Sequence, residues 1–149
     1  MLKTIFLKGI IMKIAVVDGK GGGIGSQVVE RLRSLNNNDI EIIALGTNSQ
    51  ATSNMLKAGA HDGSTGENAV VWMSKKVDII IGPLAIIAAN SMMGEISPKM
   101  AEAIASSDAR KLLLPVSKCN IDVIGLENLQ FKIIFNELIE TIKRMLHEK

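Results

Sequence analysis

The chain has 149 residues, of which 47% are hydrophobic and 21% are charged, and its formal net charge is +2. This length suffices for one well-buried domain and is too short for a cofactor domain joined to a separate substrate domain. The lysines are scattered and are not interleaved with aromatic residues, which argues against a nucleic-acid surface. A single cysteine, Cys119, excludes an internal disulfide and fits a reducing cytoplasm. No Cys or His lies near it at metal-ligand spacing, so no metal site is predicted.

The first eleven residues form an apolar stretch that could be mistaken for a signal peptide. It lacks a small-residue cleavage site and runs directly into a strand pattern. We therefore expect residues 1–11 to be a non-native or disordered extension, with Met12 as the native start and residues 12–149 as one domain. No later segment has the roughly 18 uninterrupted apolar residues of a membrane helix. The apolar run 77–89 is broken by Asp78 and by a Gly-Pro pair.

Short β-branched runs alternate with helical patterns along the chain, which is typical of a parallel sheet with crossover helices. The apolar runs predict strands at residues 13–17, 40–45, 77–81, 112–114 and 121–124. The helical patterns predict helices at residues 24–35, 50–57, 66–76, 84–93, 98–105 and 129–147. Ser97 is the expected cap of the helix that begins at Pro98. The last helix carries an apolar stripe of Phe131, Ile134, Phe135, Leu138, Ile142 and Met145.

Together these elements predict a single three-layer, Rossmann-like α/β domain with a long C-terminal helix. With the strands numbered along the chain, we expect the order 2-1-3-4 and a fifth strand at the edge. The crossovers should be right-handed. A ligand would then lie at the carboxyl ends of the strands, at the switch point above strand one.

Five glycines within seven residues connect strand one to the first helix, namely Gly19, Gly21, Gly22, Gly23 and Gly25. Glycine allows a sharp turn and lets a ligand touch the main chain, and the helix start that follows offers unpaired N–H groups to an anion. We expect this loop to hold a diphosphate, with Asp18 orienting the loop or a ribose and Ser26 donating a hydroxyl. The predicted cofactor-binding residues are Asp18, Gly19, Lys20, Gly21, Gly22, Gly23, Ile24, Gly25, Thr47, Asn48, Ser49, Gly82 and Pro83.

The glycine loop has more than one interpretation. The spacing of Gly19, Gly23 and Gly25 resembles the opening of short-chain dehydrogenases, which implies NADP or NAD. The stretch 19–22 also resembles the lysine-bearing phosphate loop of cytoplasmic partitioning ATPases, but that family needs a lysine directly before its Ser or Thr. Here Gly25 precedes Ser26, so we prefer a dinucleotide. A third interpretation is a glycine turn that only permits close packing of helix on strand.

Dinucleotide folds hold the adenosine ribose about 20 residues past the glycines, at the end of strand two. No Asp or Glu stands there, where the chain has Thr47, Asn48 and Ser49. Hydroxyl and amide groups suit a 2′-phosphate, which favours NADP over NAD. The same residues also fit the N-terminal cap of the next helix. A helix cap and a phosphate site can occur together, because a helix N-terminus itself binds anions.

Candidate catalytic residues are few. Short-chain dehydrogenases protonate their substrate with a tyrosine, and this chain has none. His61 and Asp62 are a candidate acid and base pair on a glycine-flanked loop, although an exposed loop histidine is commonly solvent-facing. Cys119 follows a predicted strand end, but a lone cysteine is also a small apolar residue. Five polar residues beside apolar helices read as capping residues, namely Glu67, Asn68, Asn90, Ser91 and Glu95.

Beyond the glycine loop, the chain from Met12 onward resembles an uncharacterised bacterial family of short Rossmann-like proteins, known as a domain of unknown function. The segments that carry this resemblance are 16–19, 21–25, 44–49, 58–60, 65–69, 82–83, 100–104 and 119–120. The resemblance implies a stand-alone nucleotide-binding-like domain with no assigned reaction.

The sequence therefore predicts a cytoplasmic binding or sensor protein for a small phosphorylated ligand, with NADP or NAD as the cofactor and a homodimer as its state. One alternative is a small enzyme that uses His61, Asp62 or Cys119. Another is a structural partner protein whose interface is the 84–93 helix or the stripe around Phe131 and Phe135.

Overall fold

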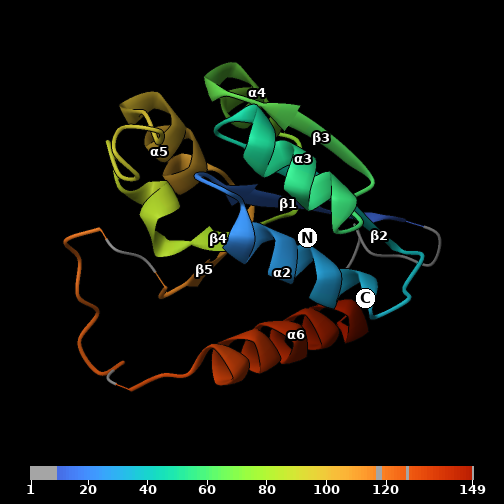
Figure 1. Ribbon diagram of the computed structural model, residues 1–149. Coiled ribbons are helices and arrows are strands. Elements are labelled where there is room, and N and C mark those ends of the chain that lie inside the picture. The colour runs from blue at the N-terminus through green and yellow to red at the C-terminus, as the bar shows by residue number, and fades with distance from the viewer. Residues whose placement is uncertain (1–9, 117–118, 127, 149) are drawn as a thin grey trace.

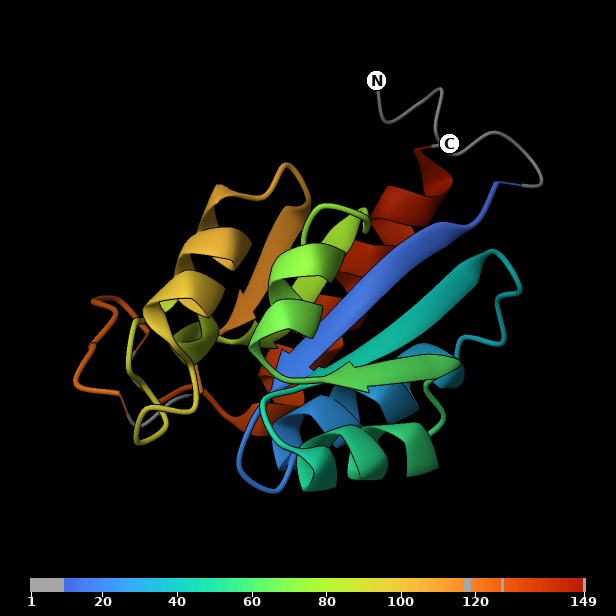
Figure 2. The same cartoon turned by 90° about the horizontal axis from the view of Figure 1, so that it is seen from above.

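The computed structural model describes residues 10–116, 119–126 and 128–148. Within them, five strands form one parallel sheet in the order β3-β2-β1-β4-β5. The strands are β1 (Met12–Asp18), β2 (Ile40–Gly46), β3 (Asp62–Thr65), β4 (Ile79–Pro83) and β5 (Arg110–Leu114). The helices are α2 (Gly23–Arg33), α3 (Ser49–Lys57), α4 (Glu67–Met73), the short 3-10 helix η1 (Leu84–Ile87), α5 (Pro98–Ser106) and α6 (Phe131–His147). Figure 2 shows the strands running in one direction.

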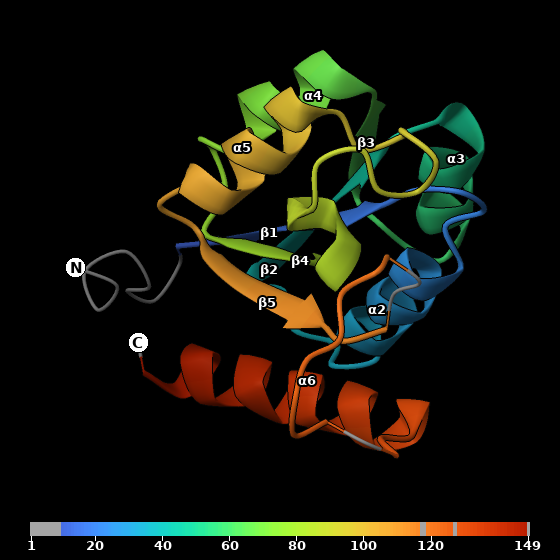
Figure 3. The same ribbon diagram turned by 90° about the vertical axis from the view of Figure 1, so that its left-hand side faces the viewer.

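Helices cover both faces of this sheet, which gives the predicted three layers. Helices α4 and α5 lie on one face, and α2 and α6 lie on the other (Figures 1 and 3). Helix α3 adds Ala51 and Met55 to the core on the α2 side. The second core joins Val70 of α4 and Ile104 of α5 to the opposite side of the sheet. The expectation of a three-layer α/β fold with a C-terminal helix is confirmed.

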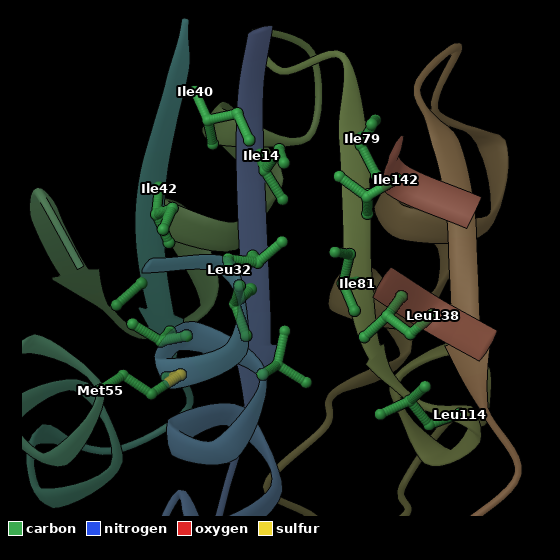
Figure 4. Close-up of a cluster of buried hydrophobic side chains, with 14 of the residues drawn as sticks. Ile14, Leu32, Ile40, Ile42, Met55, Ile79, Ile81, Leu114, Leu138 and Ile142 are labelled. Carbon is green, nitrogen blue, oxygen red and sulfur yellow. The ribbon is translucent and has the colours of Figure 1, made fainter. Parts of the chain in front are cut away.

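The central strand explains why the sheet forms as it does. Six of the seven residues of β1 are buried, because β1 pairs with β2 on one side and β4 on the other. Alternate residues enter the two cores, so that Ile14 packs under α2 and α6 while Ala15 packs under α4 and α5. Figure 4 shows the first core, with Ile14, Ile81 and Leu138 among its members. Continuous apolar strands of this kind are typical of parallel sheets covered on both faces.

The predicted strand order is confirmed for four strands and wrong for the fifth. The runs 13–17, 40–45, 77–81 and 112–114 became β1, β2, β4 and β5, in the expected order. The edge strand is β3, which has no large apolar side chain and is held by main-chain pairing with β2. The run 121–124 forms no strand, and Ile124 is 92% exposed. Apolar composition alone therefore missed the edge strand β3 and predicted a strand at 121–124 that the structure does not have.

The predicted 84–93 helix is also wrong. Only η1 is helical, after which Ala88 is extended and Asn90, Met92 and Met93 have positive φ angles. The Ser91 hydroxyl donates a hydrogen bond to the Ala85 carbonyl oxygen at 2.5 Å. A side chain thus occupies a carbonyl that a continued helix would use in its main-chain hydrogen bonds. The segment between η1 and α5 is therefore a folded loop, which we call the 88–96 loop.

Helix α5 begins as expected, because the Ser97 hydroxyl accepts a hydrogen bond from the Met100 N–H and Pro98 is the first helical residue. The stripe of the C-terminal helix α6 is mostly confirmed as core. Ile134, Phe135, Leu138, Ile142 and Met145 are buried. Phe131 departs from the expectation at 54% exposure, because it lies in the first turn and projects past the core.

Among the described residues, no helix is long and apolar enough to cross a membrane. Residues 1–9, which make up most of the predicted extension, lie outside the described residues.

Two phenylalanines of α6 give a matched test of this packing. Phe135 is 1% exposed and the Arg31 guanidinium lies over its ring, 5.2 Å from the centroid, whereas Phe131 is largely exposed. We expect Phe135→Ala to lower the free energy of unfolding by about 3–5 kcal/mol and Phe131→Ala by less than about 1 kcal/mol. Urea unfolding of both variants measures the difference. Equal losses would contradict the assignment of α6 to the core.

Candidate functional site

The glycine loop lies at the carboxyl end of β1, where the chain leaves the sheet to enter α2. The next strand along the chain, β2, lies on one side of β1, and β4 lies on the other. This is a topological switch point, the usual place for ligands in open α/β sheets. A cleft of about 550 Å³ opens there. It is lined by Asp18, Gly19, Lys20, Gly21, Gly23, Ile24, Gln27, Pro83, Ala85, Met92, Met93, Val116 and Cys119.

Some glycines of the loop are required by packing. A Cβ on Gly22 would lie 2.9 Å from the Ala51 backbone, and the φ of Gly22 is +69°. A Cβ on Gly25 would lie 2.5 Å from the Met55 sulfur. These glycines let α2 pack closely on α3 and on β1, so for them the interpretation as a packing turn is sufficient.

Gly21 and Gly23 differ, because none of the described residues requires a glycine there. A Cβ on either residue would meet no atom of the described residues within 4 Å, and neither has a positive φ. Both line the cleft. Within the described part of the chain, their N–H groups donate no hydrogen bond. They therefore leave open main chain at a helix start, which is the arrangement that binds anions.

The Asp18 carboxylate organises the loop from inside. It is 5% exposed and accepts hydrogen bonds from the Gly19 N–H at 2.8 Å and the Gly25 N–H at 2.7 Å. Burial raises the pKa of this carboxyl above its ordinary 3.8, while the hydrogen bonds from Gly25 and Gly19 lower it. The expected role of Asp18 in orienting the loop fits these contacts. They also use N–H groups of the loop that we had assigned to a diphosphate, so Gly19 and Gly25 are not available to a ligand in this conformation.

The Glu95 carboxylate fills a second polar site beside the loop. Its Oε1 accepts hydrogen bonds from the Lys20 N–H at 2.9 Å, the Thr47 hydroxyl at 2.6 Å and the Asn48 side-chain amide at 2.8 Å. The Lys20 ammonium lies 3.7 Å from Oε2. The Thr47 hydrogen bond, helped by Lys20 and Asn48, lowers the pKa of Glu95 below its ordinary 4.5. We call this set of donors from Lys20, Thr47 and Asn48 the anion seat.

The expectation that Glu95 is a helix-capping residue is wrong, because it reaches the glycine loop instead. Gly19 explains how it fits there, since a Cβ on Gly19 would lie 2.7 Å from Thr47 Oγ1 and 3.0 Å from Glu95 Oε1. Asn48 takes the helix-capping role predicted for the end of strand two. Its Oδ1 caps α3 by accepting from the Ala51 N–H at 2.8 Å, while its amide nitrogen faces Glu95. Ser49 is the exposed first residue of α3.

The remaining predicted residues fall in different places. Pro83 lines the cleft, whereas a Cβ on Gly82 would lie 2.5 Å from the Val17 carbonyl oxygen, so Gly82 serves the packing of β4 on β1. The Ser26 hydroxyl oxygen is buried, has no hydrogen-bond partner among the described residues, and is absent from the cleft lining.

The candidate catalytic residues do not come together. Asp62 is the first residue of β3, and His61 directly precedes it. The His61 Nδ1 accepts a hydrogen bond from the Ile42 N–H at 2.9 Å, and its Nε2 lies against the Arg33 guanidinium. Ile42 lies four residues before the end of β2, so the His61 ring is roughly 13 Å from the carboxyl edge by strand rise. Cys119 lines the cleft. Among the described residues no cluster of His, Cys, Asp or Glu is arranged to hold a metal ion.

Comparison with known proteins identifies the family. A family model described as "Domain of unknown function (DUF3842)" matches residues 13–147. The chain belongs to this family. The resemblance inferred from the sequence motifs is therefore confirmed for residues 13–147. No curated protein matches the chain.

Two solved structures match this chain at low sequence identity. A dodecameric FMN-dependent UbiX-like decarboxylase from Escherichia coli O157:H7 is 17% identical, with a TM-score of 0.47, and the match covers 90% of this chain and 76% of the decarboxylase. A probable oxidoreductase from Mycobacterium abscessus is 14% identical, with a TM-score of 0.47, and the match covers 91% of this chain and 40% of the oxidoreductase. At these identities the likeness concerns the fold alone.

The contacts of Asp18 give a stability test of the loop. Asp18→Ala would leave the Gly19 and Gly25 N–H groups without their acceptor in a buried place, so we expect a loss of about 1–3 kcal/mol in the free energy of unfolding. Asp108→Ala, which removes an exposed carboxylate, is the matched control and should change little. Urea unfolding measures both. An Asp18→Ala variant as stable as the parent would contradict this, because the cost of burying the charge would then fully offset its hydrogen bonds.

Proposed function

We propose that this protein binds a small phosphorylated nucleotide in the cleft at the carboxyl edge of the sheet. The observation that carries the proposal is the pair Gly21 and Gly23. Both are glycines that the fold does not require, and both line the cleft with free N–H groups among the described residues. A phosphate is the group that such open main chain at a helix start accommodates.

The lining of the cleft suits both parts of a nucleotide. Lys20 and the start of α2 belong to this lining and favour negative charge. Apolar side chains, among them Met92, Val116 and Pro83, also line the cleft and accept a base or another flat ring. The volume of about 550 Å³ lies within the usual range of small-molecule sites.

Among dinucleotides we propose NADP rather than NAD. The support is the anion seat at the end of β2, near the place where dinucleotide folds hold the adenosine ribose. Its groups from Lys20, Thr47 and Asn48 are all donors, and they already hold a carboxylate. Once Glu95 leaves, this seat of donors suits a 2′-phosphate. With Glu95 in place, its carboxylate is the acceptor that the ribose hydroxyls of NAD would need.

We propose a binding or sensor role rather than catalysis. His61 and Asp62 lie away from the cleft, and of the three candidate catalytic residues only Cys119 lines it. The cytoplasmic location and the homodimer remain part of this proposal. The cytoplasmic location rests on the single cysteine of the sequence. The homodimer rests on the exposed apolar side chains of Phe131, Ile133 and Ile124.

Ligand binding is tested first by thermal unfolding with NADP, NAD, FMN, ATP and coenzyme A. A nucleotide that binds only the folded state stabilises it by about 2.7 kcal/mol at a hundredfold excess over Kd. The decisive variant is Gly23→Ala, whose methyl group meets no atom of the described residues but stands at the cleft. We expect it to weaken binding about tenfold or more, equal to about 1.4 kcal/mol. Its stability should be unchanged or raised by up to about 1 kcal/mol, because alanine restricts the unfolded chain.

Ser53→Ala is the matched control, since it places the same methyl side chain on an exposed position of α3 away from the cleft. Isothermal titration calorimetry measures both affinities. A Gly23→Ala variant that binds as tightly as the parent would contradict the proposed role of the loop.

A further inference from the structure

The anion seat is the most complete polar site in the described part of the chain. The Glu95 Oε1 accepts three hydrogen bonds of 2.6–2.9 Å, from a main-chain N–H, a hydroxyl and an amide. An ammonium group lies 3.7 Å from its second oxygen. These donor types, converging on one oxygen, are the ones that proteins use to bind phosphoryl oxygens. The Glu95 carboxylate therefore stands where a ligand anion fits.

The segment that delivers Glu95 is folded for this contact. The 88–96 loop has positive φ angles at Asn90, Met92 and Met93, which are sparsely populated conformations for residues with side chains. Its base is fixed by the hydrogen bond from the Asn90 N–H to the Ile96 carbonyl at 2.7 Å. Hydrogen bonds within the loop, such as Glu95 N–H to the Met92 carbonyl at 3.1 Å, hold its main chain. The Glu95 side chain reaches from this loop into the seat and keeps 27% of its surface exposed. The carboxylate is thus reachable from solvent and can be replaced by a side-chain movement.

The same loop forms part of the cleft wall. Met92 and Met93 line the cleft, and a Cβ on Gly19 would lie 2.6 Å from the Met92 sulfur. Release of Glu95 would therefore free the anion seat directly beside the wall of the cleft. The two parts of a ligand, its main body and its second phosphate, meet the same loop.

We infer that Glu95 is an internal competitor for a phosphomonoester group of the ligand, which binds to Lys20, Thr47 and Asn48 in its place. This inference rests on the proposed function, and it adds a regulated second phosphate site beside the cleft, with Lys20 shared between the two. Two anions cannot share one set of donors, because like charges at this separation repel strongly. Binding of the phosphomonoester therefore requires Glu95 to leave, and the apparent affinity is reduced by the fraction of molecules with Glu95 in the seat.

The test uses NADP and NAD, which differ by one phosphomonoester, and the full chain in four forms. Glu95→Gln keeps the size of the side chain and removes its charge. Thr47→Val removes one donor of the seat. Glu102→Gln, an exposed carboxylate of α5, is the control for Glu95. Calorimetry gives the affinity of each form for both nucleotides, and circular dichroism confirms that each form is folded.

We expect Glu95→Gln to tighten NADP binding about tenfold and to change NAD binding by less than about threefold. Thr47→Val should weaken NADP binding more than NAD binding, and Glu102→Gln should change neither. If the parent binds a nucleotide and Glu95→Gln weakens NADP binding or leaves it unchanged, the inference is overturned and the proposed function stands. If none of the four folded proteins binds either nucleotide, the inference and the dinucleotide proposal both fall.

Discussion

The structure depends on the short hydrogen bonds between the buried Asp18 carboxylate and the main chain of the loop that follows it. Asp18 ends the central strand, and by accepting from Gly19 and Gly25 it fixes the path of the chain from β1 into α2. The loop can turn this tightly because Gly22 and Gly25 leave room for α3 and β1. Gly21 and Gly23 are then left on the outside of the turn, at the cleft.

Two carboxylates of the protein accept hydrogen bonds from the main chain of this loop. One carboxylate, Asp18, is used inside the loop to shape it, and a second, Glu95, is used outside it in the anion seat. Burial raises the pKa of Asp18, and hydrogen bonds lower the pKa of Glu95. The buried carboxylate is a fixed part of the fold, whereas the outer one is replaceable. The loop therefore shows its affinity for negative charge through the protein's own side chains.

The sequence was sufficient where periodicity and side-chain chemistry act locally. The strands rich in Ile and Val, the helix start at Ser97 and the burial of Phe135 all followed from patterns within a few residues. The sequence was insufficient where contacts between residues far apart in the chain decide which segments form strands. Strand β3 has little apolar character and exists because β2 offers a free edge to pair with.

In the candidate site, too, the features with a local sequence signal were predictable and those that depend on long-range contacts were not. The glycines and Asp18 were evident from their spacing, but the sequence did not reveal which N–H groups Asp18 would use. Glu95 lies 75 residues from Lys20, and nothing local distinguishes it from a capping residue. The only local signal was that Glu95 follows Asn90, Met92 and Met93, which adopt turn conformations with positive φ angles. The sequence did not reveal these conformations, because the apolar run 84–93 predicted a helix.

Phosphate binding at the open glycines is best tested by titrating ¹⁵N-labelled protein with NADP and monitoring the amide resonances of the glycine loop. The Gly21 and Gly23 amide signals should shift the most and move downfield, as donors to a phosphate do. If NADP shifts other amides while those of Gly21 and Gly23 stay unchanged, the open glycines are not a phosphate site.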